Sequence, residues 1–356
     1  MKDFHRRNYR IIAVGGDRDT GDWPVPVAYV RIAGLSSAAG ALFRTPRALW
    51  QLSRLLRTKR PALLLTFTIK PNIFCGLLSG NATPTHVATL TGLGYTFLTG
   101  SVRRRVVSLL YRLAFRRTAA LVFHNADDAE YFRRHQLAQP RQIHIIPGSG
   151  VDTEHFVPQP LPGRGELLRL LFVGRLLKNK GIVELVDAVT SLHRQGYQLE
   201  LHVVGTLYPD NPAALTPAEW AALSNSPAVV VHGYLRDIRP ILYACHLFAL
   251  PSHREGMPLS VLEAMAAGRP VLTTDVPGCR TAVSHGVSGW VVPAASRQHL
   301  KETIIAAIES PPYRLQQFGQ AGRARAEQLF SKRVIVEKYA RLVHYLRPFA
   351  PSPPAE

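Results

Sequence analysis

The chain is poor in cysteine and has no long apolar run. Its 356 residues include three cysteines, Cys75, Cys245 and Cys279, which are widely spaced and odd in number. This pattern argues against a disulfide framework or a cysteine-rich metal cluster, and it indicates a reducing compartment. No apolar run approaches the roughly 18 residues that cross a bilayer, and the charged first ten residues are not followed by the apolar segment of a signal peptide. The sequence therefore predicts a cytoplasmic chain.

Acidic residues are missing from a long part of the N-terminal half. No Asp or Glu occurs between Trp23 and Ala126, whereas the same stretch holds fourteen Lys and Arg residues. Residues 1–150 carry 22 Lys+Arg and 7 Asp+Glu, a net charge of +15, and residues 151–356 carry 21 and 17, a net charge of +4. This asymmetry predicts an anionic partner, which could be nucleic acid or an anionic membrane. The absence of zinc-finger spacing, of an RNA-recognition signature and of a basic–aromatic platform argues against nucleic acid.

The basic excess is strongest in the segment 101–118, SVRRRVVSLLYRLAFRRT, which has the period of an amphipathic helix. The residues available for its apolar stripe are Val106, Leu109, Leu110, Leu113 and Ala114. The arginines without a neighbouring carboxylate are Arg103, Arg104, Arg105, Arg112, Arg116 and Arg117. They form either a solvated face or a surface that lies against anionic headgroups. In the second case each basic residue contributes about 1 kcal/mol to membrane binding. We favour the second interpretation, which predicts a peripheral protein on the inner face of the cytoplasmic membrane.

Short apolar strands alternate with helices in both halves of the chain, which predicts an α/β protein with parallel sheets. The length and the hydrophobic content of 46% suit two globular domains. The proline- and glycine-rich segment 158–165 is the expected domain boundary. It divides the chain into an N-terminal domain (1–157), a second domain (158–330) and a final helix with a loose tail (331–356).

The stretch 247–275 has the most specific pattern in the chain. An apolar strand is followed by a polar loop and then by a helix that begins near Pro258. Gly256 lets the backbone of the loop approach a ligand closely. The first helical turn has free N–H groups at the positive end of the helix, which suit a diphosphate, and they belong to Met257, Leu259 and Ser260.

Two glutamates flank this anion seat. Glu255 precedes the helix, and Glu263 lies roughly 7 Å along the axis from the seat at 1.5 Å rise per residue. This distance is about that between a diphosphate and a ribose, so both carboxylates are placed to accept hydrogen bonds from sugar hydroxyls. The alternative is a capped surface helix with two solvated glutamates, and the spacing alone does not decide between them.

The segment 252–278, SHREGMPLSVLEAMAAGRPVLTTDVPG, closely resembles family 4 of the retaining glycosyltransferases, in which two glutamates stand in the same E-x7-E arrangement. The resemblance implies the GT-B fold, with two Rossmann-like, doubly wound domains facing a cleft. It also implies that Glu255 lies near the donor sugar and that Glu263 holds the donor ribose.

The segment 174–181, GRLLKNKG, resembles the phosphate clamp of the same family, which implies that Arg175 and Lys180 bind the donor diphosphate. Tyr234 follows a strand at the point where family members hold the nucleobase against the backbone. The resemblance assigns donor binding to Gly174, Arg175, Lys180, Tyr234, Glu255, Gly256, Met257, Pro258, Leu259, Ser260 and Glu263. Catalysis falls to Glu255, Arg175 and Lys180. No metal ion or other cofactor is expected, since the two cations take the place of a metal.

The segments 67–74 (FTIKPNIF) and 89–97 (TLTGLGYTF) resemble one branch of the family, which adds N-acetylhexosamines to polyprenyl-diphosphate sugars. The expected acceptor-side residues are Lys70, Thr91, Gly92, Leu93, Gly94 and Asn125. Family members normally have a further strand and helix before the strand that corresponds to residues 9–14. The N-terminal domain is therefore expected to lack its first β–α unit. A D-x-D at Asp17 and Asp19 could hold a metal ion, but a plain turn is the favoured interpretation.

These observations give one leading hypothesis and two alternatives. The leading hypothesis is a metal-independent, retaining glycosyltransferase that moves a hexose or N-acetylhexosamine from a UDP-linked sugar to a lipid-linked or polysaccharide-precursor acceptor. The first alternative is a truncated, catalytically impaired remnant that binds a nucleotide sugar or a membrane. The second alternative, a nucleic-acid binder, is supported by charge alone. The expected partners are the donor, the lipid-linked acceptor and an anionic membrane, without nucleic acid.

Overall fold

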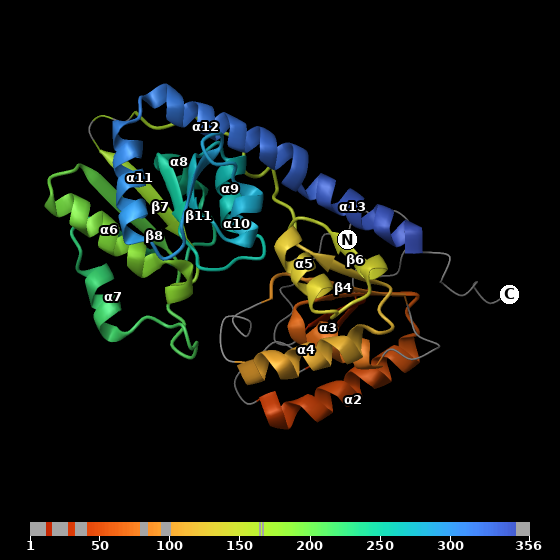
Figure 1. Ribbon diagram of the computed structural model, residues 1–356. Coiled ribbons are helices and arrows are strands. Elements are labelled where there is room, and N and C mark those ends of the chain that lie inside the picture. Colours follow the sequence, from red (N-terminus) through yellow and green to blue (C-terminus); the bar gives the residue numbers. More distant parts are fainter. Residues whose placement is uncertain are drawn as a thin grey trace. The chain divides into compact units, whose positions relative to one another are not determined.

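The computed structural model describes residues 12–15, 28–32, 41–78, 85–93, 101–163, 165 and 167–346. They fall into two compact units. Unit 1 contains the chain up to Ile146 and again from Val336, and unit 2 is the continuous segment Pro147–Ile335. Both units are built of parallel strands and helices (Figure 1), which confirms the expected α/β class.

Unit 2 has a sheet whose strand order identifies a doubly wound fold. The order is β12-β11-β10-β7-β8-β9, and all neighbouring strands are parallel. The direction of winding reverses between β7 and β10, so the carboxyl ends of these two strands form the topological switch point. The strands are β7 (Leu168–Val173), β8 (Leu199–Val204), β9 (Val229–Gly233), β10 (Leu247–Leu250), β11 (Val271–Thr274) and β12 (Gly289–Val292).

Helices cover both faces of this sheet (Figure 1). On one face α6 packs against α11, and on the other α9 packs against α10 and α12. The helices are α6 (Ile182–Arg194), α7 (Pro217–Ser224), α8 (Arg239–Ala244), α9 (Leu259–Ala266), α10 (Pro277–Ala282), α11 (Arg297–Glu309) and α12 (Pro312–Arg325). A 3-10 turn (Lys178–Lys180) precedes α6, and a π-helical turn (Ala326–Phe330) follows α12.

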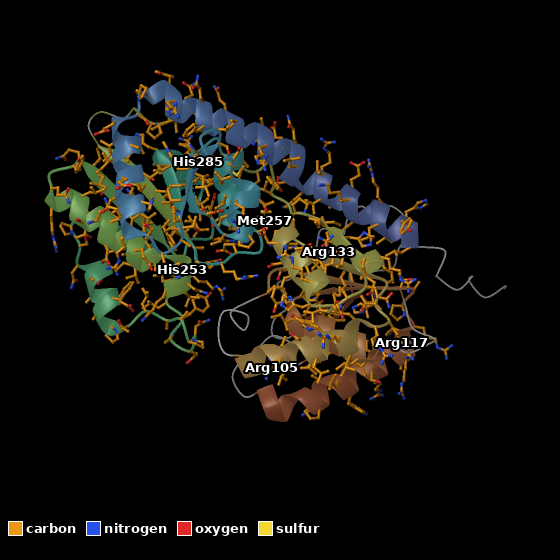
Figure 2. The ribbon with its side chains drawn as sticks, in the orientation of Figure 1. Arg105, Arg117, Arg133, His253, Met257 and His285 are labelled. Carbon is orange, nitrogen blue, oxygen red and sulfur yellow. The ribbon has the colours of Figure 1, made fainter. Side chains whose placement is uncertain are left out.

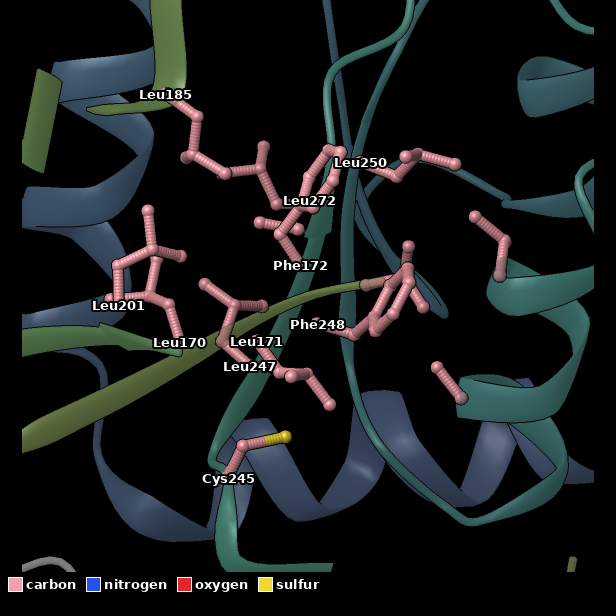
Figure 3. Close-up of a cluster of buried hydrophobic side chains, with 14 of the residues drawn as sticks. Leu170, Leu171, Phe172, Leu185, Leu201, Cys245, Leu247, Phe248, Leu250 and Leu272 are labelled. Atoms are coloured by element: carbon pink, nitrogen blue, oxygen red, sulfur yellow. The ribbon is translucent and has the colours of Figure 1, made fainter. Parts of the chain in front are cut away.

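The core of unit 2 lies where β7 and β10 pair. Strand β10 is a continuous apolar run and β7 is apolar apart from Arg169, because both faces of the sheet are covered. Figure 3 shows Phe172 and Phe248 among the surrounding leucines. Cys245 lies in the same cluster. None of the three cysteines, all of which the structure describes, forms a disulfide, and burial raises the pKa of each thiol to about 12, so at neutral pH they are packed as protonated thiols.

Unit 1 contains a parallel sheet of order β3-β4-β5-β6 and a separate parallel pair, β1-β2. The strands are β1 (Ile12–Gly15), β2 (Ala28–Arg31), β3 (Leu63–Phe67), β4 (Thr85–Leu90), β5 (Ala120–Phe123) and β6 (Ile143–Ile145). The helices are α2 (Ala41–Lys59), α3 (Ile69–Leu78), α4 (Ser101–Phe115) and α5 (Ala126–Arg134), with a 3-10 turn at Pro140–Gln142. Helix α3 packs against both α2 and α4.

The last helix, α13 (Lys332–Leu346), begins in unit 2 and continues into unit 1. There the Tyr339 hydroxyl lies 3.0 Å from Oγ1 of Thr89 on β4, and Leu342, Val343 and Leu346 are buried. The absence of a first β–α unit stays a prediction. In the part of the chain that the structure describes, no helix is both long enough and apolar enough to traverse a bilayer.

The division between the units differs from the boundary expected at residue 158, because the proline-rich segment is fastened to unit 2. The buried guanidinium of Arg269 donates to the carbonyl oxygens of Gln159 and Pro160. Arg323 on α12 donates to the carbonyl oxygens of Thr153 and Phe156. The composition of this segment is that of a linker, but these hydrogen bonds anchor it, and the division falls earlier, after Ile146.

Candidate functional site

Two loops leave the sheet of unit 2 side by side at the topological switch point. One follows β7 and runs from Gly174 to Gly181, and the other follows β10 and runs from Pro251 to Pro258. Since β7 and β10 are neighbouring parallel strands, both loops emerge at the same edge of the sheet. Open α/β sheets bind ligands at this edge.

Backbone contacts hold the two loops together. Gly181 has a φ of 72°, and a Cβ at this position would lie 2.6 Å from the carbonyl carbon of Pro251 and closer still to its oxygen. Only glycine fits such a close approach in the left-handed region. The N–H of His253 donates to the carbonyl oxygen of Asn179 at 2.9 Å. Residues of the first loop therefore have a fixed position relative to those of the second.

Lys180 and Glu255 form an ion pair across the two loops. The Lys180 ammonium group contacts Oε1 of Glu255, and the side chains are 17% and 11% exposed. The hydroxyl of Ser252 donates to the same oxygen at 2.8 Å. Because both donors bind Oε1, the second carboxylate oxygen of Glu255 is available to accept from a ligand, and Lys180 keeps further N–H donors for an anion.

Arg175 is held without being neutralised. Its guanidinium lies over the ring of Tyr208, 5.7 Å from the ring centroid, in a cation–π contact. The side chain is exposed, and among the described residues it forms no ion pair. Arg175 can therefore bind a phosphate from solvent.

The loop after β10 leads into α9 and packs against the start of α10. Helix α9 begins at Leu259 after Pro258, and no side chain caps it, so its first N–H groups are available to a ligand. The N–H of Gly278 donates to the Glu255 carbonyl oxygen at 3.1 Å, and a Cβ at residue 278 would lie 2.5 Å from the carbonyl oxygen of Gly256. Met257 packs on the core of unit 2 (labelled in Figure 2). These contacts fix the loop against α10 and the core of unit 2.

Glu263 lies inside α9 and is half-buried. Burial raises the pKa of its carboxyl group to about 7, against the opposing effect of Lys332. The group therefore changes its charge near neutral pH. Perturbed carboxyl groups of this kind are typical of binding and catalytic sites.

A second pair, His253 and Glu184, joins the loop after β10 to α6. Nε2 of His253 lies 3.1 Å from Oε1 of Glu184 (His253 is labelled in Figure 2). This hydrogen bond raises the pKa of His253 although partial burial opposes it. Burial pushes the pKa of Glu184 upward, but the His253 hydrogen bond and nearby charges bring it below its ordinary value. Sequence reasoning gave His253 no role because its partner is 69 residues away in the chain.

The remaining donor-side residue, Tyr234, follows β9 and is 75% exposed. A group that is so open to solvent can stack on a ligand without first breaking contacts inside the protein. The N–H of Gly205 donates to the carbonyl oxygen of Gly233 at 2.8 Å, which ties the end of β9 to the end of β8. The role of Tyr234 stays a prediction.

The expected acceptor-side residues have different environments in unit 1. Asn125 is buried as the N-cap of α5, where its Oδ1 accepts from the Asp128 N–H at 2.8 Å. Leu93 is buried in the core, Thr91 is exposed and Lys70 lies on α3. Gly92 has a φ of 144°. Gly94 lies outside the described residues, as do Asp17 and Asp19.

Among the residues that the structure describes, no group of three or more His, Cys, Asp or Glu side chains could hold a metal ion. The two loops at the switch point instead carry the Lys180–Glu255 pair and the exposed Arg175. Their arrangement suits a diphosphate, which arginine and lysine bind through charge-assisted hydrogen bonds.

Two family models match the chain. One, described as "Glycosyl transferase 4-like domain", covers residues 3–148, and the other, "Glycosyl transferases group 1", covers residues 168–310. Together they span most of both units.

Curated proteins with similar sequences include glycosyltransferases of bacterial surface glycans. The chain is 27% identical over 274 residues to the N,N'-diacetylbacillosaminyl-diphospho-undecaprenol alpha-1,3-N-acetylgalactosaminyltransferase of Campylobacter jejuni. That match covers 73% of this chain and 70% of the Campylobacter protein. The chain is 32% identical over 167 residues to the capsular polysaccharide biosynthesis glycosyltransferase CapM of Staphylococcus aureus, covering 47% of this chain and 43% of CapM.

Solved structures support the fold. The sucrose-phosphate synthase of Thermosynechococcus elongatus has a TM-score of 0.81 at 19% sequence identity and covers 97% of this chain and 91% of its own. Anabaena HepE, solved in complex with UDP-glucose, has a TM-score of 0.73 at 19% identity, covering 90% of this chain and 86% of its own. These likenesses confirm the expected GT-B fold.

Proposed function

The chain belongs to the glycosyl transferases of group 1, and we propose that it moves a sugar from a UDP-linked donor to a lipid-linked acceptor in cell-surface glycan synthesis. The observation that carries this proposal is the Lys180–Glu255 pair at the switch point of unit 2, with the exposed Arg175 on the same loop as Lys180. The names of the Campylobacter and Staphylococcus relatives support the lipid-linked and capsular context.

In this proposal the two cations bind the donor diphosphate and stabilise the charge that develops on it as the sugar leaves. Electrostatic stabilisation by groups that are already in place is usually the largest single contribution to such catalysis. The N–H groups at the start of α9 add to the same anion seat. Glu255 orients the donor sugar through its free oxygen. No metal ion is required, because Arg175 and Lys180 supply the positive charge.

Retention of the anomeric configuration follows from the family resemblance. No nucleophile is assigned on the acceptor side, so the acceptor hydroxyl attacks the same face of the sugar that the diphosphate leaves. The leaving phosphate takes the proton of the hydroxyl as the new glycosidic bond forms. The resemblance of the segments 67–74 and 89–97 favours an N-acetylhexosamine as the transferred sugar.

The proposal is tested by turnover with defined substrates. The purified protein is mixed with UDP-sugars and a short-chain polyprenyl-diphosphate sugar, and mass spectrometry looks for an acceptor heavier by one sugar. Product is expected in the presence of EDTA, and NMR of the new linkage is expected to show retention. Binding of the donor in calorimetry without any product would favour the alternative of a catalytically impaired remnant. A complete dependence on added metal would refute the metal-independent mechanism.

The raised pKa of Glu263 predicts how the affinity for UDP changes with pH. The carboxylate accepts hydrogen bonds from ribose hydroxyls, and its pKa of about 7 leaves it largely protonated below that value. The affinity of the parent protein for UDP should therefore rise between about pH 6 and about pH 8. In Glu263→Gln this rise should disappear, and the affinity above pH 7 should fall about tenfold, since a hydrogen bond to a charged group contributes about 1.5–3 kcal/mol.

Calorimetric titration of UDP into both proteins measures this effect, and Glu309→Gln on α11 is the matched control.

The raised pKa of Glu263 also predicts how the stability of the protein depends on pH. Because burial raises the pKa of Glu263 above its ordinary value, its contribution to stability is present at low pH and is lost as pH rises through about 7. Between low pH and about pH 7, the Glu263→Gln variant should therefore lose less stability than the parent protein. An unchanged UDP affinity at every pH would remove the ribose role.

We also propose that the enzyme acts at the inner surface of the cytoplasmic membrane. Two considerations support this: the lipid-linked acceptor lies there, and the stretch Trp23–Ala126 has fourteen cationic and no acidic residues. Anionic headgroups attract such a stretch, and salt screens the attraction within a Debye length of about 8 Å. Nucleic acid is not among the proposed partners.

A further inference from the structure

Helix α4 exposes a row of aliphatic side chains. Val106, Leu109 and Leu113 are 53%, 55% and 47% exposed. Their spacing of three and four residues places them in one ridge along the helix. The opposite side of α4 is occupied by Tyr111, Ala114 and Phe115, which are buried in the core of unit 1. The aliphatic ridge is therefore not required for the packing of the helix.

Arginines form a second exposed ridge beside the first. Arg105 and Arg112 are exposed, lie seven residues apart on α4, and are rotated by roughly 80° from the aliphatic ridge at 3.6 residues per turn. Arg116, which is also exposed, directly follows the helix. Figure 2 labels Arg105 on α4 and Arg117 just beyond the end of this helix. Nη2 of Arg112 donates to the His135 carbonyl oxygen at 3.0 Å, which fixes this side chain without neutralising it. Within the described residues, these arginines form no ion pair with a carboxylate.

The two ridges together restrict what can cover this face. A solvated helix does not gain from three exposed aliphatic residues in line, and such rows mark interaction sites. A second copy of the chain would bring the same cationic face, so a symmetric contact would place like charges together. Nucleic acid would match the arginines but not the aliphatic ridge. A helix with an aliphatic face and flanking arginines is instead the pattern of helices that lie in the interface of an anionic bilayer.

We propose that α4 lies in the headgroup–acyl boundary of an anionic membrane, with Val106, Leu109 and Leu113 inserted and the arginines at the level of the lipid phosphates. Arginine can keep its head at this level while its alkyl stem covers apolar surface. The inference rests on the proposed function, which gives the protein a lipid-linked acceptor. It goes beyond electrostatic attraction, because it assigns part of the binding to burial of defined side chains.

The experiment is co-sedimentation with vesicles of phosphatidylcholine alone or mixed with phosphatidylglycerol, at low and high salt. The parent should bind the mixed vesicles and should retain part of this binding at high salt, since burial of apolar surface is not screened. Val106→Ser/Leu109→Ser/Leu113→Ser should lower the binding about tenfold or more and make the remainder sensitive to salt. Arg105→Gln/Arg116→Gln should lower binding at low salt while leaving the salt-resistant part.

Val287→Ser is the matched control, because Val287 is 57% exposed but lies in unit 2, outside α4. This variant should bind the vesicles as the parent does. UDP affinity and thermal unfolding of each variant should be unchanged, since the replaced residues are exposed. Equal binding of the parent and the triple serine variant would overturn the proposal, as would equal binding to neutral and mixed vesicles. A dimer of the parent that dissociates in the serine variant would assign the face to a second copy. Competition by added DNA that abolishes vesicle binding would assign it to nucleic acid. Vesicle binding can persist when no turnover is found, so the two proposals fail separately.

Discussion

Lys180→Met is expected to lower kcat by about 10²- to 10³-fold, the loss that follows removal of one preorganised donor to a developing anion. Lys180 is positioned for this role by its ion pair with Glu255 and by the fixed approach of the two loops at Gly181. Methionine keeps most of the side-chain volume but has no charge. The affinity for the ground-state donor should fall less than kcat, because the charge on the diphosphate is greatest when the sugar departs.

Lys178→Met is the matched control for this experiment. Lys178 lies in the same 3-10 turn, and its ammonium group pairs with Glu219 at 3.1 Å rather than with the site. This variant should keep nearly the full kcat. The double variant Lys180→Met/Glu255→Gln should lose less than the product of the two single losses, because the residues act together. Normal turnover of Lys180→Met together with a lowered melting temperature would make Lys180 a structural residue.

Gly181→Ala should destabilise unit 2 by about 3–5 kcal/mol and abolish most of the turnover. An alanine in the left-handed region costs roughly 1–2 kcal/mol. The remainder comes from the overlap of the new Cβ with the Pro251 carbonyl group, which is backbone and cannot move aside without displacing the loop after β10. Displacement of this loop would separate Lys180 from Glu255.

Gly196→Ala isolates the conformational part of this cost. Gly196 has a φ of 91°, but no atom lies within 4 Å of a Cβ built there. Urea unfolding should show a loss of about 1–2 kcal/mol for Gly196→Ala with full turnover, and the larger loss for Gly181→Ala. Equal losses in the two variants would show that the close approach to Pro251 relaxes without consequence.

The strands of unit 2 are predictable from sequence because each is a short segment rich in apolar residues. The apolar strand expected at the start of the stretch 247–275 is β10, Leu247–Leu250. These features depend on local composition and on the repetition of strand and helix, so no tertiary contact is needed to infer them.

The orientation of α4 could not be predicted in the same way. Its period identifies a helix, and Ala114 is buried as expected, but Val106, Leu109 and Leu113 are exposed instead of facing the core. The large aromatic residues Tyr111 and Phe115 decide the orientation, because they stack on each other and contact Phe132 of α5. Apolar residues occur on more than one side of this helix, so the sequence alone does not say which of them face the core.

The contacts of the site show a similar limit. The spacing of Glu255 and Glu263 and the loop 174–181 are visible in the sequence, but the pairing of Lys180 with Glu255 joins residues 75 positions apart. The pair exists because β7 and β10 are neighbours in the sheet although two other strands lie between them in the chain. Asn125 is expected near the acceptor, and only the structure shows that it is buried as the N-cap of α5.

The path of α13 has a consequence for the order in which the protein is made. Translation runs from the N-terminus, and domains generally fold as units during synthesis. Unit 1 begins first, yet it needs the residues from Val336 onward, whereas unit 2 is one continuous segment that ends before them. On the ribosome, unit 2 therefore has its full sequence earlier than unit 1. A premature stop codon after Ile335 would leave the sequence of unit 2 complete. Unit 1 would then lack the helix that supplies Tyr339 to β4.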